Sequence, residues 1–339
     1  MERAKYGVWL RGIAAIGLCS LAGLCICGCI SKVPPNGSGT GAATGASSGS
    51  STSSGISISI HGSSTVYPIS QAVAEAYKAK NPAVEIDVGQ SGTSGGFKKF
   101  VSLEADICDA SRPIKEAEMK LCAEKGIEYL ELNIAVDALT VAVNPANDWV
   151  DCLSVSQLKR IWEPGSTVQK WNDIDPSWPD QEIKLFGADT DSGTFDYFTE
   201  AINGKEDVSR SDYTANSNDN VLVQGVAEEK YSLGYFGYGY YAENQQRLKS
   251  LKIKATDGGE CIAPTTENVD ADLYKPLARP LFIYVNKAAL KRPEVAGYLQ
   301  FYLSDEGQAA VVERKFIRVR SSILEEMRQR LDEALAAAK

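Results

Sequence analysis

The chain contains 339 residues, with 44 acidic and 35 basic side chains, a formal net charge of −9 and one histidine. The acidic excess argues against a nucleic-acid-binding protein, because such proteins need basic stripes along the phosphate backbone. The single histidine argues against a zinc site and against Ser–His hydrolase chemistry. We therefore expect no metal, no cofactor and no nucleic-acid partner.

The first 28 residues are typical of a cleaved targeting segment. A basic stretch is followed by an apolar stretch at residues 12–28, which runs into Ile26-Cys27-Gly28-Cys29. This ending resembles a bacterial lipobox, in which the last Cys becomes the lipid-carrying first residue of the mature protein. We predict a lipoprotein signal peptide over residues 1–28 and lipidation at Cys29. The alternative is an uncleaved membrane anchor, although the stretch is short for a hydrocarbon core of ~30 Å.

Residues 29–55 are rich in Ser, Gly, Thr and Ala and contain two prolines. A segment of this composition cannot bury much apolar surface, so we predict a flexible tether. Anchor and tether together predict that the folded part works beside the outer face of a bacterial membrane, in a periplasm or on a cell surface.

Short strands and helices alternate through the next part of the chain. Apolar residues alternate as in strands at residues 56–60, 84–88 and 139–143, and a short strand-like segment covers residues 105–110. Helical spacing follows at residues 69–77 and 97–101, and Ser111-Arg112-Pro113 indicates the start of a helix that reaches residue 126. The alternation predicts an α/β fold with parallel strands.

Two apolar segments predict strands that cross between two lobes. They are DALTVAVN at residues 137–144 and RPLFIYVN at residues 279–286. The folded part is also too long for most single cores. We predict one lobe from residues 56–136 and 281–339 and a second lobe from residues 137–280. Helices at residues 293–303, 305–313 and 321–338 are expected to complete the first lobe.

Four of the eight cysteines fall in the folded part, at Cys108, Cys122, Cys152 and Cys261. An even number of cysteines in an exported chain suggests disulfides. Three pairings are possible. We favour Cys108–Cys122, which lie close in sequence, together with Cys152–Cys261; the alternative is buried free thiols.

Four predicted helix starts share one composition. They are Ser63-Ser64-Thr65, Thr93-Ser94-Gly95-Gly96, Ser111-Arg112 and Ser192-Gly193-Thr194. Each lies between a strand-like segment and a helix, where free backbone N–H groups and a positive dipole end favour an anion. Helix capping explains any one of them, but four in two lobes, one with an Arg, predict a shared site for a small tetrahedral anion. No nucleotide-binding glycine loop is present in the sequence.

The order of the motifs carries a family resemblance. GSSTVYP, GQSGTSGGFKKF, ADICDASRPIK, LTVAVNPANDWV, DTDSGTFDYF, LGYFGYGYY and RPLFIYVN occur between Ile56 and Arg320. In this order they resemble the phosphate-binding proteins of high-affinity phosphate ABC transporters. The resemblance implies a two-lobed α/β fold of the type II periplasmic-binding-protein class, with two hinge-crossing strands and the ligand in the cleft. It also implies closure on binding and handover to a membrane permease.

The resemblance implies a set of phosphate ligands from the four helix starts. In chain order, these are Ser64, Thr65, Thr93, Ser94, Gly95, Ser111, Arg112, Ser192, Gly193 and Thr194. Two positions depart from the family: some members carry Asp where this chain has Ser111, and many carry Arg where it has Ala188. We therefore expect Arg112 to supply the positive charge. Arg210 is a second candidate, and its alternative is a solvated cation in a loop.

The acids beside the fourth start suggest a means of discrimination. Phosphate near neutral pH still carries a proton and sulfate does not, so a carboxylate in the site accepts that proton and repels sulfate. Asp191 is the first candidate for this role and Asp212 the second; the alternative for Asp191 is a helix cap.

Taken together, the sequence predicts a lipid-anchored, extracytoplasmic receptor that binds inorganic phosphate and passes it to the permease subunits of an ABC importer. It is expected to be a monomer and not an enzyme. The alternatives are a receptor for another oxyanion (sulfate, molybdate or arsenate), an exported phosphatase, or a sensor on the same fold.

Overall fold

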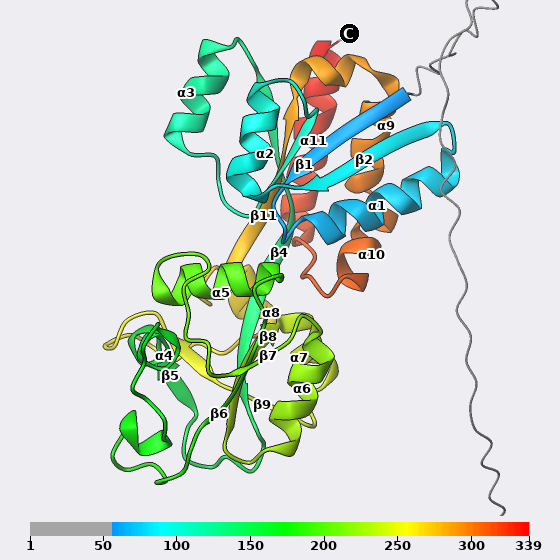
Figure 1. The fold of residues 1–339 in the computed structure, drawn as a ribbon. Helices are drawn as coiled ribbons and strands as arrows, with labels where there is room; N and C mark the ends of the chain where they lie inside the picture. Colours follow the sequence, from blue (N-terminus) through cyan, green and yellow to red (C-terminus); the bar gives the residue numbers. More distant parts are fainter. Residues whose placement is uncertain (1–55, 339) are drawn as a thin grey trace, which may run out of the picture. The chain divides into compact units, whose positions relative to one another are not determined.

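Two antiparallel strands, β4 (Tyr129–Val143) and β11 (Ala278–Asn286), run side by side from one lobe of the protein to the other (Figure 1). They belong to a computed structural model that describes residues 56–338. The predicted signal peptide, the predicted lipidation site Cys29 and the predicted tether at residues 29–55 lie outside the described residues. Within residues 56–338, no helix combines the length and the apolar character that a membrane crossing requires.

A mixed nine-stranded sheet extends on both sides of the two crossing strands, with the strand order β2-β1-β3-β11-β4-β8-β6-β7 and with β9 paired to β4. In the first lobe β1, β2 and β3 are parallel; in the second, β6 is parallel to β8 and β7. A two-stranded sheet pairs β5 with β10. The strands besides β4 and β11 are β1 (Ile56–Gly62), β2 (Val84–Gln90), β3 (Ile107–Ala110), β5 (Cys152–Ser154), β6 (Lys184–Gly187), β7 (Thr214–Ala215), β8 (Ser232–Gly237), β9 (Lys249–Ser250) and β10 (Lys252–Lys254).

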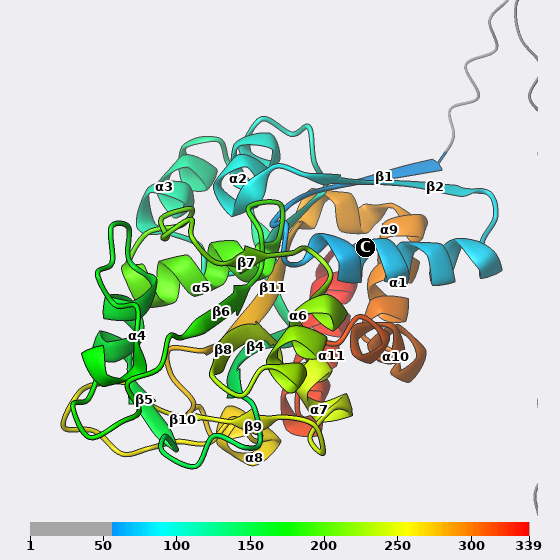
Figure 2. The same ribbon diagram turned by 60° about the horizontal axis from the view of Figure 1, so that its bottom comes forward.

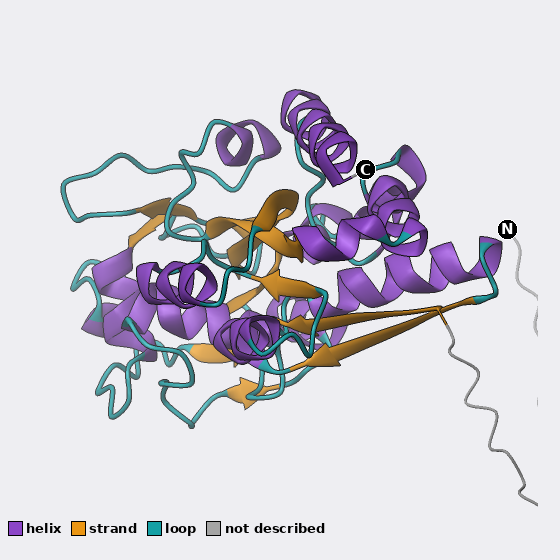
Figure 3. Ribbon diagram, turned by 90° about the horizontal axis from the view of Figure 1, so that it is seen from above, coloured by secondary structure: helices purple, strands orange, loops and turns teal. Residues whose placement is uncertain are grey.

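Helices cover both faces of the sheet in the first lobe (Figures 2 and 3). They are α1 (Tyr67–Lys80), α2 (Gly92–Val101), α3 (Glu116–Glu124), α9 (Pro293–Tyr302), α10 (Asp305–Glu313) and α11 (Ser321–Ala338), with a 3₁₀ turn η2 (Lys287–Lys291). Successive residues of a strand point to opposite faces. Accordingly, Ile283 packs with α1, α9 and α11, whereas its neighbours Phe282 and Tyr284 pack with α2 and α3.

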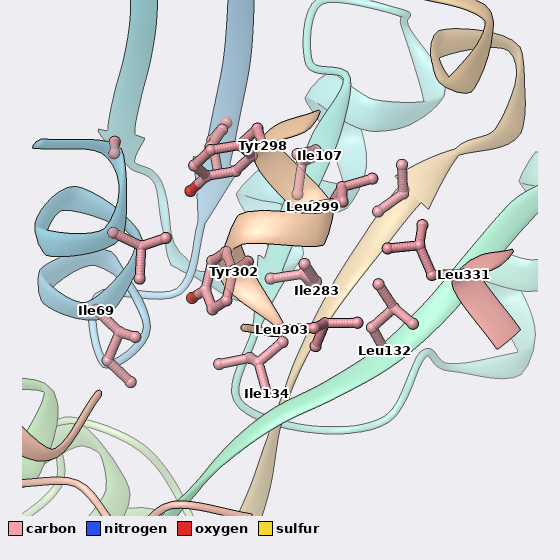
Figure 4. Close-up of a cluster of buried hydrophobic side chains, with 14 of the residues drawn as sticks. Ile69, Ile107, Leu132, Ile134, Ile283, Tyr298, Leu299, Tyr302, Leu303 and Leu331 are labelled. Atoms are coloured by element: carbon pink, nitrogen blue, oxygen red, sulfur yellow. The ribbon is translucent and has the colours of Figure 1, made fainter. Parts of the chain in front are cut away.

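Figure 4 shows the larger of these two cores. Tyr298, Leu299 and Tyr302 of α9, and Leu303 directly after it, lie over Ile107 and Ile283 of the sheet. Leu132 and Ile134 of β4 complete the same cluster, and Leu331 joins it from the terminal helix. The predicted helix at residues 321–338 is confirmed, and this burial explains why its apolar residues recur at helical spacing.

The second lobe has its own core, built largely from aromatic side chains. Phe198 and Tyr235 stack with ring centroids 3.6 Å apart, and Trp162 packs edge-on against both rings. The helices of this lobe are α4 (Val155–Trp162), α5 (Gly193–Asn203), α6 (Asp219–Glu228), α7 (Tyr238–Glu243) and α8 (Thr266–Asp270), with a 3₁₀ turn η1 (Trp171–Asp173).

The change from one core to the other falls on the crossing strands. On β4 the first core includes Ala135 and the second begins with Ala138. Along the other crossing segment, the second core ends at Leu277, just before β11, and the first begins at Leu281 on β11. The lobe boundaries predicted at 136/137 and 280/281 lie in these intervals and remain a proposal. A third segment contacts the crossing strands at this point: Ile317 exchanges two backbone hydrogen bonds with Val136 of β4 and packs against the second core.

Two sequence predictions about local structure are wrong. The strand beginning at residue 137 in fact starts at Tyr129, so β4 has 15 residues. The helix expected to start at Ser111 starts at Glu116. Pro113 disfavours helical geometry at the residue before it, and the Glu118 carboxylate accepts the Lys115 N–H at 2.8 Å, which begins the helix there.

The disulfide prediction is half right. Cys152 and Cys261 are bonded, with Cα atoms 6.1 Å apart, and connect β5 to the segment after β10. The Cys108–Cys122 bond is wrong, because both are buried free thiols in the core beneath α2 and α3. Burial raises the pKa of both thiols, which disfavours the thiolate needed for disulfide formation.

Candidate functional site

A polar cavity of about 550 Å³ lies between the lobes, beside the crossing strands. Three of the four predicted motifs line it, and they come from three turns of the first lobe. The opposite wall comes from α5 and the loop that follows it in the second lobe. The lining residues are Ser63, Ser64, Thr65, Ser91, Gly92, Thr93, Ser94, Gly95, Ser111, Arg112, Lys115, Asp196, Glu200, Gly204, Lys205, Glu206, Asp207 and Arg279.

The first turn follows the end of β1. Gly62 ends the strand with φ +157°, and a Cβ there would overlap the backbone oxygen of Asp109 at 2.0 Å. Ser63 donates its N–H to that same oxygen at 2.9 Å. This close approach of two backbones brings Ser64 and Thr65 to the cavity wall, directly before α1.

The second and third motifs are held against each other at the carboxyl ends of β2 and β3. The Ser111 N–H donates to the hydroxyl oxygen of Thr93 at 3.2 Å, and the two hydroxyls lie 3.1 Å apart. Thr93 and Ser94 belong to the first turn of α2, as predicted. Ser111 and Arg112 do not begin a helix, but they still reach the cavity through these contacts.

Arg112 is paired within its own lobe. Its guanidinium forms a two-pronged ion pair with Glu118, with N–O distances of 2.8 and 2.9 Å. A third hydrogen bond runs to the Ser94 hydroxyl oxygen at 3.0 Å. Burial alone would raise the pKa of Glu118, but its hydrogen bonds with Arg112 and Lys115 lower the pKa by more, so the pKa of Glu118 is below its usual value. The predicted cation is therefore present at the cavity but is largely neutralised.

Arg279, which the sequence analysis did not assign, is a second cation at the cavity. It begins the β11 crossing directly opposite Asp137 on β4, and the Arg279 Nε lies 3.4 Å from the carboxylate. Its Nη2 donates to the Thr65 hydroxyl oxygen at 3.1 Å, and its guanidinium lies 3.6 Å from the Tyr197 ring centroid. Its side chain is only 12% exposed. Burial raises the pKa of Asp137, and Arg279 opposes that rise.

The sequence held only part of a signal for Arg279. Each of the two predicted crossing strands begins with a charged residue, Asp137 in one and Arg279 in the other, and the charges are opposite. The strands are antiparallel, so the starts of two fully overlapping strands would lie at opposite ends of the pair. Asp137 meets Arg279 only because β4 begins eight residues earlier, at Tyr129.

The fourth motif contacts the first but faces a different cavity. Ser192 caps α5 by accepting the Thr194 N–H at 3.2 Å. Ser192, Gly193 and Thr194 line an adjacent cavity of about 320 Å³, which shares Ser64 and Thr65 with the first. Gly193 approaches Thr65 closely, since a Cβ added to it would lie 2.7 Å from the Thr65 hydroxyl oxygen. The structure therefore groups three motifs around one cavity and places the fourth at its border.

Three other predicted candidates do not line either cavity. Asp191 is exposed, and its N–H donates to Asp189. Arg210 is 4% exposed, donates to the backbone oxygens of Ile161 and Val168, and pairs with Asp212. That pairing lowers the pKa of Asp212 to about 2. Arg210 thus stabilises the second lobe internally and is not a solvated loop cation.

The carboxylate that does face the first lobe is Asp196, in the first turn of α5. Its Oδ2 accepts the Ser64 hydroxyl at 2.9 Å across the cavity. Desolvation raises the pKa of Asp196, although the hydrogen bond from Ser64 opposes this. Glu200, one turn later on α5, also lines the cavity. Within residues 56–338, no group of three or more His, Cys, Asp or Glu side chains is arranged to hold a metal ion.

The chain is similar to known proteins over most of its length. The family described as "PBP superfamily domain" matches residues 37–306. Protein SphX of Synechocystis is 48% identical over 258 residues, covering 75% of this chain and 76% of that protein. The phosphate-binding protein PstS of Staphylococcus saprophyticus is 38% identical over 275 residues, covering 81% of this chain and 84% of that protein. The crystal structure of a possible phosphate binding protein from Planctomyces limnophilus is 55% identical with a TM-score of 0.79, covering 82% of this chain and 98% of that chain.

Two α/β lobes, crossing strands and a donor-rich cavity between the lobes define a binding protein of the type II periplasmic class. The predicted fold class is confirmed. At these identities and coverages the chain belongs to the PBP superfamily and, within it, to the family of the PstS phosphate-binding proteins. The resemblance inferred from the ordered motifs is likewise confirmed.

Proposed function

We propose that this protein is an extracytoplasmic receptor that binds inorganic phosphate in the 550 Å³ interlobe cavity and delivers it to the permease subunits of an ABC importer. The observation that carries the proposal is the convergence of three hydroxyl-rich turns on one cavity, opposite a carboxylate. The relatives described above include proteins named for phosphate binding, and the chain is a binding protein rather than an enzyme.

The cavity suits a small oxyanion because its donors are mostly neutral and its two arginines are already paired with carboxylates. Lys115 and Lys205 also line it, and their charges are offset by the four carboxylates of the opposite wall. Hydroxyls and backbone N–H groups from the first lobe can surround the anion, as they do at helix starts in many α/β folds. A hydrogen bond to a charged group contributes about 1.5–3 kcal/mol. Several such bonds give tight binding without an excess of positive charge that would attract any anion.

Asp196 takes the discriminating role that the sequence analysis gave to Asp191. Bound phosphate still carries a proton, which it can donate to the Asp196 carboxylate. The Ser64 hydroxyl donates to that carboxylate. When the phosphate O–H takes this place, the Ser64 hydroxyl becomes free to donate to the anion. Sulfate has no proton to offer and is repelled by the carboxylate. Because the pKa of Asp196 is raised, this discrimination should weaken as the pH falls and the carboxylate becomes protonated.

Calorimetric titration with phosphate and with sulfate between pH 5 and pH 9 tests the proposal. The wild-type protein should bind phosphate and exclude sulfate at pH 8. Asp196→Asn should bind phosphate at least about 10-fold more weakly, as expected for one charged hydrogen bond, and should gain affinity for sulfate. Equal affinity of the wild type for the two anions, or no heat with phosphate, would overturn the function. An unchanged preference in Asp196→Asn would overturn only the role of Asp196.

The anchor and the monomeric state also remain proposals. The sequence around Cys29 supports lipidation, and residues 29–55 are long enough to hold the folded part off a membrane. Cys29→Ser should shift the protein from the membrane fraction to the soluble fraction of the producing cell. A wild-type protein without a lipid-modified N-terminal peptide in mass spectrometry would contradict the anchor, and sedimentation with and without phosphate tests the monomer.

A further inference from the structure

Two of the proposed phosphate ligands share an unusual hydrogen-bond arrangement. The hydroxyl oxygen of Ser94 accepts an N–H from Arg112 at 3.0 Å, and the hydroxyl oxygen of Thr65 accepts one from Arg279 at 3.1 Å. In both cases a ligand of the anion and an arginine on the same cavity wall are bonded to each other.

A carboxylate holds each of these arginines in place. Glu118 accepts two N–H groups of Arg112 at 2.8 and 2.9 Å, and both side chains are largely buried. Asp137, which is 5% exposed, lies opposite Arg279 on the paired strand and 3.4 Å from its Nε, and Glu200 lies 3.6 Å from its Nη1. A guanidinium is planar, so fixing one edge against a carboxylate fixes the direction of its remaining N–H groups.

The arrangement leaves Arg112 little capacity to bind an anion directly. Its two terminal nitrogens donate to both Glu118 oxygens, to the Pro113 backbone oxygen and to Ser94. These four contacts use all four terminal N–H hydrogens, and only the Nε–H has no acceptor within residues 56–338. The nearby Glu118 also cancels most of the attraction that the Arg112 charge would exert at a distance.

A serine or threonine hydroxyl has one hydrogen, which rotates to suit its surroundings. When the oxygen accepts from an arginine, the hydroxyl hydrogen must point away from that arginine. The Ser94 hydroxyl has no acceptor of its own within residues 56–338, and it lines the cavity. The Thr65 hydroxyl donates a long hydrogen bond to the Gly193 backbone oxygen, at 3.4 Å. The Ser94 hydroxyl is therefore free to donate to a ligand, and the Thr65 hydroxyl can do so by giving up this long hydrogen bond.

We propose that Arg112 and Arg279 are positioning residues. Each guanidinium, fixed by its own carboxylate, donates to the hydroxyl oxygen of Ser94 or Thr65 and so directs that hydroxyl hydrogen toward the bound anion. The inference rests on the proposed phosphate function, and it assigns the two arginines an indirect role in place of direct charge pairing with the ligand. Glu118 and Asp137 serve the same purpose one step further from the anion.

A double-mutant cycle on the full chain separates the indirect role from the direct one. Phosphate affinity is measured by calorimetry for Ser94→Ala, Arg112→Gln and the double variant. If Arg112 acts through Ser94, Arg112→Gln lowers affinity about 10-fold in the wild type, as for one lost hydrogen bond to a charged group, and less than about 2-fold in the Ser94→Ala background. An equal loss in both backgrounds would overturn the proposal. Thr65→Val with Arg279→Gln gives the matching cycle on the hinge side.

Glu118→Gln provides a second test whose sign differs between the two roles. If Arg112 attracted the anion by its charge, removing the Glu118 charge would strengthen phosphate binding, and more so at low salt. If Arg112 orients Ser94, losing one prong of the fork loosens that orientation and weakens phosphate binding about 3- to 10-fold. Stronger binding in Glu118→Gln would overturn the proposal even if Arg112→Gln does not fold.

Arg160→Gln is the matched control for removing one arginine. Arg160 lies on α4, donates to the backbone oxygen of Asp173 and does not line the cavity. The Arg160→Gln variant should bind phosphate as tightly as the wild type. An equal loss of affinity in Arg160→Gln and Arg112→Gln would show a general charge effect and overturn the proposal. If the wild-type protein does not bind phosphate at all, the proposed function itself fails; if it binds but Arg112→Gln costs the same affinity with and without Ser94, only the positioning role fails.

Discussion

The two walls of the cavity are built in different ways. The first-lobe wall consists of turns at the ends of β1, β2 and β3, whose hydroxyls and N–H groups donate hydrogen bonds. The second-lobe wall consists of α5 and the loop that follows it. Here the Asp196 carboxylate accepts the Ser64 hydroxyl, and Glu200, one helical turn later, lies 3.6 Å from the Arg279 guanidinium. The motif that begins α5 faces the neighbouring cavity instead.

This difference shows how a site can be selective without a surplus of charge. Donors at turns can be supplied by almost any residue with a hydroxyl, and they hold any oxyanion. The acceptors on the opposite wall are few, and they require a ligand that carries a proton. On the proposed function, we therefore expect affinity to depend mainly on the first lobe and selectivity on the second, and the predictions below test that division.

The largest expected effect concerns stability and should be confined to the second lobe. The Cys152–Cys261 bond joins residues 109 positions apart, and a closed loop of this length stabilises a protein by about 4–5 kcal/mol in the chain-entropy account. The double variant Cys152→Ser, Cys261→Ser should lose about that much free energy of unfolding in guanidinium, whereas its phosphate affinity at low temperature should change little.

The control for this variant is Cys122→Ala in the first lobe, where the thiol is free. It should lose at most about 1 kcal/mol, because only one buried sulfur atom is removed. A loss as large as that of the double variant, or a Cys108–Cys122 cross-link in a non-reducing peptide map, would show that the first lobe is also held by a disulfide.

The next largest effect concerns the first lobe, whose free energy of unfolding should depend on pH through Asp109. Asp109 is fully buried at the end of β3; its Oδ1 accepts the Ser70 hydroxyl, which lies 3.2 Å from the Tyr302 hydroxyl, and its Oδ2 has no partner within residues 56–338. Burial raises the pKa of Asp109 from 3.8 to about 7. Between these values the unfolded chain has lost the proton and the folded protein keeps it, so stability falls as the pH rises from about 4 to about 7, by about 4 kcal/mol.

Asp109→Asn removes this titration and should flatten the curve of unfolding free energy against pH. It should be more stable than the wild type at pH 8, by about 1–3 kcal/mol after allowing for the new unpaired amide, and no more stable at pH 5. Guanidinium unfolding at the two pH values measures the difference. Parallel curves for the two proteins would mean that Asp109 is ionised in the folded state at both pH values.

A smaller effect should come from the border between the walls. Gly193→Ala adds a Cβ that would lie 2.7 Å from the Thr65 hydroxyl oxygen and 3.0 Å from its Cα. Alanine suits the first turn of a helix better than glycine does, so the second lobe should not be destabilised. The added methyl should instead keep the lobes apart and weaken phosphate binding about 10-fold. Gly258→Ala, which has nothing within 4 Å, is the control, and equal affinities of the two variants would argue against lobe contact at Thr65 in the bound state.

The sequence could predict those parts of the molecule that depend on local patterns. Alternating apolar residues located β1, β2 and the second half of β4, and helical spacing located α11. The first half of β4 and the late start of α3 were missed, because one depends on pairing with a strand more than 130 residues away and the other on a side-chain cap at Lys115.

The same limit applies to the site. The donors of the first-lobe wall were predicted because each lies just after a strand, which is a local signal. Their partners were missed because the contacts are remote: Asp196 meets Ser64 across 132 positions, and Arg279 meets Thr65 across 214. Asp191 is adjacent in sequence to a predicted ligand and Asp196 is not, which favoured Asp191. In the structure, the face of α5 that carries Asp196 and Glu200 lies toward the first lobe, whereas the residue before the helix cap does not line the cavity.

The smallest expected effect on phosphate binding is that of Asp191→Asn, although the sequence alone predicts a large one. Asp191→Asn removes a carboxylate that is exposed and lines neither cavity. Its charge near the start of α5 stabilises the helix dipole by a few tenths of a kcal/mol at low salt, and solvent screens it from the cavity. Phosphate affinity and the preference over sulfate should stay within about 2-fold of the wild type in calorimetric titrations at low and at high salt. A loss comparable to that of Asp196→Asn would mean that, in the bound state, the residue before the α5 cap points toward the anion, and not the helix face that carries Asp196 and Glu200. The second lobe would then contribute both donors and acceptors, and the two walls could no longer be divided into one that donates and one that accepts.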